Sequence, residues 1–341
     1  MADAMLVGGV NLDSAEEVFR TVARVAGDSV RRIPDGAGGR RRDLISAQLP
    51  LLFVNPAFEQ AVVERPAYGS GTVSASVFRP KAGIDVGSVR LALPYARDAV
   101  VTYSVFADLQ EKGELPADAV YQVTLPTAIA STSLLDPAAH RGLLPRIEAA
   151  LGEQVRAIAT TVPPERLAIQ WDVEIEFLAM EMELMGGQHG TFGRLDILNA
   201  LARLSALVPK EVELGFHLCY GNLDGRPFLQ PQDAGLLVEV ANHVASTAER
   251  TLNWVHLPVP AGRADDAYFA PLAGLRLGLD TRLYLGLVHA EDGLEGATKR
   301  VEAASAHIRG FGVATPCGLQ HVPADVIPTI LQIQRDLVVP A

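Results

Sequence analysis

The chain contains only two cysteines among its 341 residues, too few for a disulfide framework. A reducing compartment is the simpler expectation, and we predict a cytoplasmic protein. Positive charge is also scarce, since 29 Lys and Arg residues face 40 Asp and Glu residues and give a formal net charge of −11. An anionic surface repels phosphate groups, so the composition argues against nucleic-acid and anionic-membrane partners.

Three further absences narrow the class of protein. We find no apolar run of about 18 residues, the length that a membrane-spanning helix needs. The N-terminal stretch "MADAMLVGGVNLDSAEEVF" turns acidic too early for a signal peptide. No glycine-rich dinucleotide fingerprint follows an early strand. These absences, with 49% hydrophobic and 20% charged residues, indicate an ordered globular protein with a sizeable core.

Short apolar runs alternate with helical patterns along the chain. The runs that read as buried strands cover residues 5–10, 120–127, 167–176, 212–221, 252–260, 282–293 and 310–318. Near-continuous apolar runs are typical of parallel strands that are covered on both faces. Strand–helix alternation therefore predicts an α/β protein with a parallel sheet.

Polar side chains close several of these runs, among them Gln170, Asp172, His217, Cys219 and Cys317. In a (β/α)8 TIM barrel the carboxyl ends of all strands meet on one face, whereas an open sheet spreads them along a line. We therefore predict one TIM-barrel domain over residues 1–341. The stretch 31–43 reads as a loop, and residues 40–115 are expected to carry an insertion or a lid.

The two cysteines suggest a metal site. His217 and Cys219 are two residues apart on a strand and so point to the same side, while Cys317 closes a later strand and His256 an intervening one. Zinc prefers this kind of thiolate and imidazole set. The alternative is that both cysteines are small core residues, which is the more common role of a free cysteine.

Several motifs resemble one known family. "HLCYGN" at 217–222 is similar to the His-x-Cys zinc motif of the C-terminal domain of cobalamin-independent methionine synthase, and "TPCGL" at 315–319 to its late Cys-Gly motif. "IQWDVEIE" at 169–176 resembles its Ile-Gln-x-Asp-Glu-Pro strand. This domain belongs to a superfamily that includes uroporphyrinogen decarboxylase-like barrels. The loop "RRIPDGAGGRR" looks more like a single-barrel branch of that superfamily.

The resemblance implies a zinc-dependent methyl or alkyl transferase that activates a small thiol as a zinc thiolate. It implies His217, Cys219 and Cys317 as Zn2+ ligands, with His256 where the family has a glutamate. The methyl donor would be a folate, a corrinoid protein or a methoxylated compound. From the length of the sequence we expect one barrel, where the full-length enzyme has two.

Four further residues receive roles. His289 lies where the family has a general acid, and its alternative is a core histidine. Asp172 would anchor an ammonium or hydroxyl group of the substrate or form a salt bridge at the rim of the barrel, with Gln170 on the same face of the strand. Asp35 would bind substrate or cap a turn, the usual role of Asp-Gly.

Two other functions remain open. A zinc-dependent lyase or hydrolase would use the same ligands with a metal-bound water or a polarised carbonyl group. A non-catalytic barrel would use His217 and Cys219 for packing alone.

Overall fold

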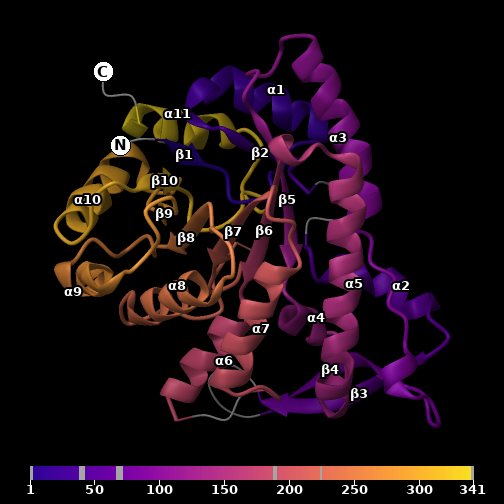
Figure 1. Ribbon diagram of the computed structural model, residues 1–341. Coiled ribbons are helices and arrows are strands. Elements are labelled where there is room, and N and C mark those ends of the chain that lie inside the picture. Colours follow the sequence, from indigo (N-terminus) through magenta and orange to yellow (C-terminus); the bar gives the residue numbers. More distant parts are fainter. Residues whose placement is uncertain (1–2, 38–42, 67–71, 187–189, 223–224, 339–341) are drawn as a thin grey trace.

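The computed structural model describes residues 3–37, 43–66, 72–186, 190–222 and 225–338. Within these ranges, eight parallel strands form one sheet in the order β1-β10-β9-β8-β7-β6-β5-β2 (Figure 1). The strands are β1 (Ala4–Met5), β2 (Arg32–Pro34), β5 (Val120–Pro126), β6 (Leu167–Val173), β7 (Glu213–Leu218), β8 (Trp254–Pro258), β9 (Arg282–Gly286) and β10 (Gly312–Ala314). A parallel bridge between Ala4 and Val30 brings the two ends of the sheet together. The predicted TIM barrel is confirmed.

Helices surround this sheet (Figure 1). The longer ones are α1 (Ala15–Val25), α3 (Tyr95–Glu111), α5 (His140–Thr161), α6 (Ile175–Leu184), α7 (Arg194–Ala206), α8 (Gly235–Thr247), α10 (Gly293–Ser305) and α11 (Ile327–Val338), and the shorter ones α2 (Leu49–Val54), α4 (Ala128–Thr132) and α9 (Asp266–Phe269). Local signals start them: the Ser14 hydroxyl accepts a hydrogen bond from the Glu17 amide and caps α1. No helix formed by the described residues combines the length and apolar character needed to cross a bilayer.

Strand β2 lies inside the stretch that the sequence analysis read as a loop. Residues 32–34 pair in parallel with the start of β5, from Arg32–Val120 to Pro34–Gln122. The strand has only three residues and begins with an arginine, so its composition carries no strand signal. Its neighbour in the sheet supplies the hydrogen bonds that make it a strand.

The segment between β2 and α3 contains an antiparallel hairpin, β3 (Phe58–Pro66) and β4 (Thr72–Pro80). The hairpin is tied to the loop after α4, because the Phe78 amide donates to the Leu134 carbonyl at 2.9 Å and the Phe78 carbonyl accepts from the Asp136 amide at 2.8 Å. Helix α3 packs against α1 and α5 in the outer layer of the barrel. The expected insertion over 40–115 therefore covered a barrel helix as well as the hairpin.

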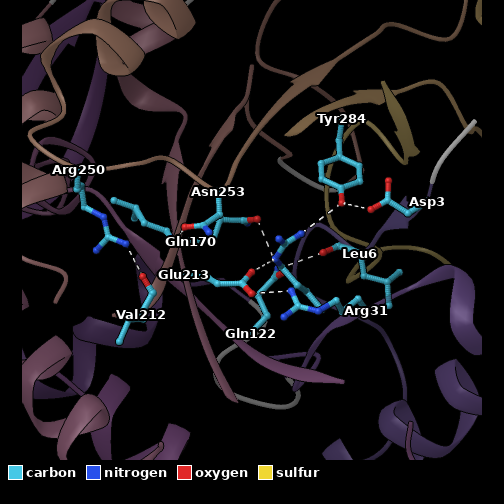
Figure 2. Close-up of polar contacts among 12 residues, drawn as sticks. Asp3, Leu6, Arg31, Gln122, Gln170, Val212, Glu213, Arg250, Asn253 and Tyr284 are labelled. Atoms are coloured by element: carbon cyan, nitrogen blue, oxygen red, sulfur yellow. Dashed lines mark hydrogen bonds and ion pairs between the residues drawn. The ribbon is translucent and has the colours of Figure 1, made fainter. Parts of the chain in front are cut away.

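A polar network closes the amino-terminal end of the barrel (Figure 2). Glu213 accepts hydrogen bonds from Arg31 and Arg32, each at 2.6 Å. The Arg32 guanidinium lies 4.4 Å from the Trp254 ring centroid, and the Tyr284 hydroxyl donates to Asp3 at 2.6 Å. These contacts fill the end opposite the carboxyl ends of the strands. In TIM barrels, residues at this end stabilise the fold, and catalytic residues lie at the other end.

Candidate metal centre

Three potential metal ligands converge at the carboxyl ends of two strands. His217 lies near the end of β7, Cys219 follows that strand, and Cys317 follows β10. The ligand atoms of these three residues all lie within 4.8 Å of one another. The predicted convergence of the His-x-Cys motif with the late cysteine is therefore present in the structure.

The donor set fits a zinc ion. The Cys219 and Cys317 sulfur atoms are 3.6 Å apart, and two thiolates bound at about 2.3 Å in tetrahedral geometry lie about 3.8 Å apart. The His217 Nε2 atom is buried and has no hydrogen-bond partner among the described residues. A buried ring nitrogen without a partner is costly unless something binds it, and a metal ion would satisfy it.

His256 lies outside this group. Its Nδ1 atom is 2.8 Å from the Nδ1 atom of His217, and its Nε2 atom is 3.0 Å from the Thr315 carbonyl oxygen. Burial lowers the pKa of His256 to about 3 and also lowers that of His217, so both rings are neutral. Both His256 nitrogens have hydrogen-bond partners, and the role of this residue as a fourth ligand stays a prediction.

Glycines shape the two cysteine loops. A Cβ atom on Gly318 would lie 2.9 Å from the Gly9 amide nitrogen, so only glycine lets the Cys317 loop approach the loop after β1 so closely. Gly221 has a φ of +83°, and its amide donates to the Cys219 sulfur at 3.2 Å. The glycines of the Cys317-Gly318 and Cys219-Tyr220-Gly221 sequences are thus required, one by the close approach of two loops and the other by its positive φ.

A cavity of about 1050 Å³ opens beside the three ligands, and its walls include His217, Cys219 and Cys317. Asp172 and Glu174 line the same cavity. Burial raises the pKa of Asp172 well above its usual range, and it raises that of Glu174 to about 7, with Asp43 and Glu176 adding repulsion.

Gln170 supports Asp172. Its side-chain amide donates to the Asp172 carboxylate at 2.8 Å and also to the Val7 carbonyl. Gln170 itself is fully buried and does not line the cavity. Its contacts therefore hold Asp172 in place from within the barrel.

Two predicted residues do not line this cavity, although Asp35 lines a small pocket that shares Gly8 and Thr124 with it. The His289 ring is 2.8 Å from the Val259 carbonyl through Nε2, and burial lowers its pKa. The Asp35 carboxylate accepts hydrogen bonds from the Ala37 amide at 2.9 Å and from the Thr102 hydroxyl at 2.9 Å. Asp35 thus makes the turn contact that was the alternative to substrate binding.

One part of the cavity wall has no counterpart among the predicted site residues. The β3–β4 hairpin contributes Glu64, Arg65 and the residues 73–76 of β4. An insertion was expected in this part of the chain, but none of the predicted site residues lies in it. Nothing in the local sequence indicates which face of the hairpin turns toward the barrel.

Comparison with known proteins reveals the same fold. No protein-family model and no curated protein sequence matches the chain. Among solved structures, a B12-independent methionine synthase from Shewanella sp. W3-18-1 in complex with selenomethionine superposes with a TM-score of 0.64 at 12% identity, over 98% of this chain and 96% of that one.

Two further structures resemble the chain. A putative vitamin-B12-independent methionine synthase from Listeria monocytogenes has a TM-score of 0.51 at 13% identity, over 95% of this chain and 86% of that one. A methyltransferase from Methanosarcina mazei has a TM-score of 0.50 at 12% identity, over 97% and 94%. The resemblance to methionine synthase barrels is confirmed at the level of the fold.

Proposed function

We propose that the protein is a zinc-dependent transferase that moves a methyl or other alkyl group onto the sulfur of a small thiol. The observation that carries this proposal is the group His217, Cys219 and Cys317 at the wall of a cavity large enough for two small molecules. The structural neighbours include methionine synthases and a methyltransferase, and one is a complex with the amino acid selenomethionine.

The chain supplies three ligands and leaves one position of a tetrahedral ion to the substrate. Zinc bound there would lower the pKa of a substrate thiol and hold it as the thiolate at neutral pH. Cys219 and Cys317 would bind as thiolates, and the Gly221 amide already donates to the Cys219 sulfur. Asp172 faces the cavity beside them, where it would accept hydrogen bonds from an ammonium or hydroxyl group of the thiol substrate.

The second substrate, the methyl donor, would occupy the rest of the cavity. A folate needs a proton on its leaving nitrogen and a methoxylated compound needs one on its leaving oxygen, whereas a methylated corrinoid leaves as cob(I)alamin without a proton. Glu174 is better placed than His289 to give it, because Glu174 lines the cavity and has its pKa raised to about 7. Glu174→Gln should therefore slow methyl transfer without lowering zinc content.

A second candidate is a zinc-dependent hydrolase or lyase. The open fourth coordination position of the proposed zinc ion also favours this function, since many catalytic zinc ions are bound by three protein ligands and one water molecule. In that reaction, Glu174 or Asp172 would act as the base toward the water.

The first experiment measures zinc by plasma mass spectrometry in the wild type, Cys219→Ser, Cys317→Ser and the control His243→Asn, whose residue lies on α8 outside the cavity wall. Near-stoichiometric zinc in the wild type and in the control, lost in both serine variants, is the expected result. No zinc in the metal-replete wild type would overturn the proposal.

The second experiment separates the two functions. The cobalt-substituted protein is titrated with homocysteine and with homoserine, which differ only in sulfur and oxygen. A charge-transfer band that grows with homocysteine alone would support thiol binding at the metal. A spectrum that responds to neither compound would favour the hydrolase or lyase.

A further inference from the structure

The buried pair His217 and His256 contains a directed hydrogen bond. The Thr315 carbonyl oxygen can only accept, so the His256 Nε2 atom, 3.0 Å away, carries a proton and donates. In a neutral imidazole the other nitrogen is then an acceptor. The His256 Nδ1 atom therefore accepts from the Nδ1–H of His217 at 2.8 Å.

This direction decides the state of the His217 ring. With its proton on Nδ1, His217 carries a lone pair on Nε2, the buried atom that has no hydrogen-bond partner among the described residues. That is the atom a metal ion needs. We infer that His256 is a positioning residue, which fixes the ring orientation and tautomer of His217 and leaves the fourth metal position to an exogenous ligand. The inference rests on the proposed zinc site.

Strand pairing and the loop of Cys317 hold the two histidine rings next to one another. His217 and His256 are register partners on the neighbouring parallel strands β7 and β8, and their ring centroids are 4.8 Å apart. The Thr315 hydroxyl donates to the Cys317 carbonyl at 2.7 Å. Hydrogen bonds therefore join His217 to His256 and His256 to the Thr315 carbonyl, and the Thr315 hydroxyl bonds the loop that holds Cys317.

The identity of the acceptor has a chemical consequence. A metal-bound histidine commonly donates its other N–H to a carboxylate, a backbone carbonyl or water, and the stronger the acceptor, the more basic the ligand. Here the acceptor is a neutral imidazole. A Zn2+ ion with two thiolates and one neutral imidazole has no net charge in total. Such a centre would bind an anionic ligand, such as a deprotonated thiol, in the fourth position.

X-ray absorption of the zinc-loaded wild type tests this directly. The expected shell without substrate has two sulfur atoms, one imidazole nitrogen and one light atom from solvent, and homocysteine should raise the sulfur count to three. A shell with two imidazole nitrogens and no sulfur gained from homocysteine would overturn the inference but leave the zinc site intact. Absence of zinc from the wild type would overturn both proposals.

Two substitutions at His256 separate the roles of its nitrogens. His256→Asn places an oxygen acceptor near the former Nδ1 position, whereas His256→Gln keeps a donor near Nε2 and has no acceptor at Nδ1. Zinc affinity is measured by chelator competition in both, with His243→Asn on α8 as the control. We expect about a 10- to 100-fold loss of affinity in His256→Gln and a smaller loss in His256→Asn.

The opposite order, or equal wild-type affinity in both variants, would contradict a positioning role. Circular dichroism melting of each variant shows whether it is folded. If both variants fail to fold, the zinc coordination shell that X-ray absorption measures in the wild type still decides between three and four protein ligands.

Discussion

The sulfur atoms of Cys219 and Cys317 lie 3.6 Å apart, although the two residues are 98 positions apart in the chain. They meet because β7 and β10 end on the same face of the barrel. Both thiols face a cavity, so a small oxidant can reach them. Without a metal, they are placed to react with one another.

We therefore expect hydrogen peroxide to convert the metal-free protein to an intramolecular Cys219–Cys317 disulfide, with two thiols giving up two hydrogens and the peroxide becoming two water molecules. Zinc should protect both thiols. Thiol titration before and after treatment measures the loss, and a reductant should restore both thiols. Cys317→Ser is the control, since it cannot form the bond. Equal oxidation rates with and without zinc would show that the metal does not hold these sulfur atoms.

Gly318 supports the second sulfur through the backbone. Gly318→Ala would place a Cβ atom 2.9 Å from the Gly9 amide nitrogen and 2.3 Å from the Gln320 side chain, so the loop that carries Cys317 must move. We expect zinc affinity to fall at least about tenfold, because small displacements of a ligand cost metal binding. Gly262→Ala is the matched control, since nothing lies within 4 Å of the added atom. Unchanged zinc affinity in Gly318→Ala would mean that the close approach is not needed.

Strands with a local sequence signal could be predicted from the sequence. A strand that forms only through pairing with a neighbouring strand could not. The run 167–176 is rich in apolar and aromatic residues at its start, and the structure makes β6 from residues 167–173. Strand β2 was missed because only its pairing with β5 makes it a strand. The predicted strand 167–176 was too long at its end, because β6 ends at Val173 and Glu176 lies in α6.

The candidate site divides in the same way. His217, Cys219 and Cys317 could be found because ligand chemistry and strand ends are visible in sequence. The hydrogen bonds of the His256 ring could not be predicted from sequence, because they depend on which ring nitrogen faces Thr315. The contribution of Arg65 to the cavity wall depends on how the hairpin packs, which no local pattern encodes.

Glu176 gives a stability prediction that depends on pH. It is fully buried, and burial raises its pKa from 4.5 to about 7, although the Thr127 hydroxyl donates to it. Between pH 4.5 and 7 the folded protein binds this proton more tightly than the unfolded chain does. The free energy of unfolding therefore falls as the pH rises through this window, by up to about 3 kcal/mol at 1.36 kcal/mol per pKa unit.

Glu176→Gln keeps an oxygen acceptor for the Thr127 hydroxyl and removes the titration. We expect it to raise the free energy of unfolding at pH 8 by about 1–3 kcal/mol and to leave it nearly unchanged at pH 4. Urea denaturation at both pH values measures the difference. The exposed residue Glu302, substituted by Gln, serves as the control. A variant with the same pH dependence as the wild type would assign the effect to other carboxyls.

Among the described residues of the cavity wall, Arg65 is the one that carries a guanidinium group. It lies on β3 opposite Val73, and its guanidinium contacts the Ser133 carbonyl at 3.5 Å. Asp172 and Glu174 line the same cavity beside the metal ligands. The cavity thus has an acidic part near the candidate metal centre and a basic group on the hairpin. A donor with an anionic group would place that group at Arg65, because guanidinium binds carboxylate with two parallel hydrogen bonds.

Arg65→Gln should therefore raise the KM for a methylated folate, which carries carboxylates, by about tenfold or more, at the roughly 1.5–3 kcal/mol of a charged hydrogen bond. The KM for a neutral methoxylated aromatic donor should change little, and zinc affinity and the cobalt response to homocysteine should stay as in the wild type. Arg79→Gln is the control, because Arg79 belongs to the same hairpin, pairs with Glu59 at 2.9 Å and lies outside the cavity wall. Similar effects of both substitutions on both donors would mean that the hairpin acts as a whole and that Arg65 selects no anion.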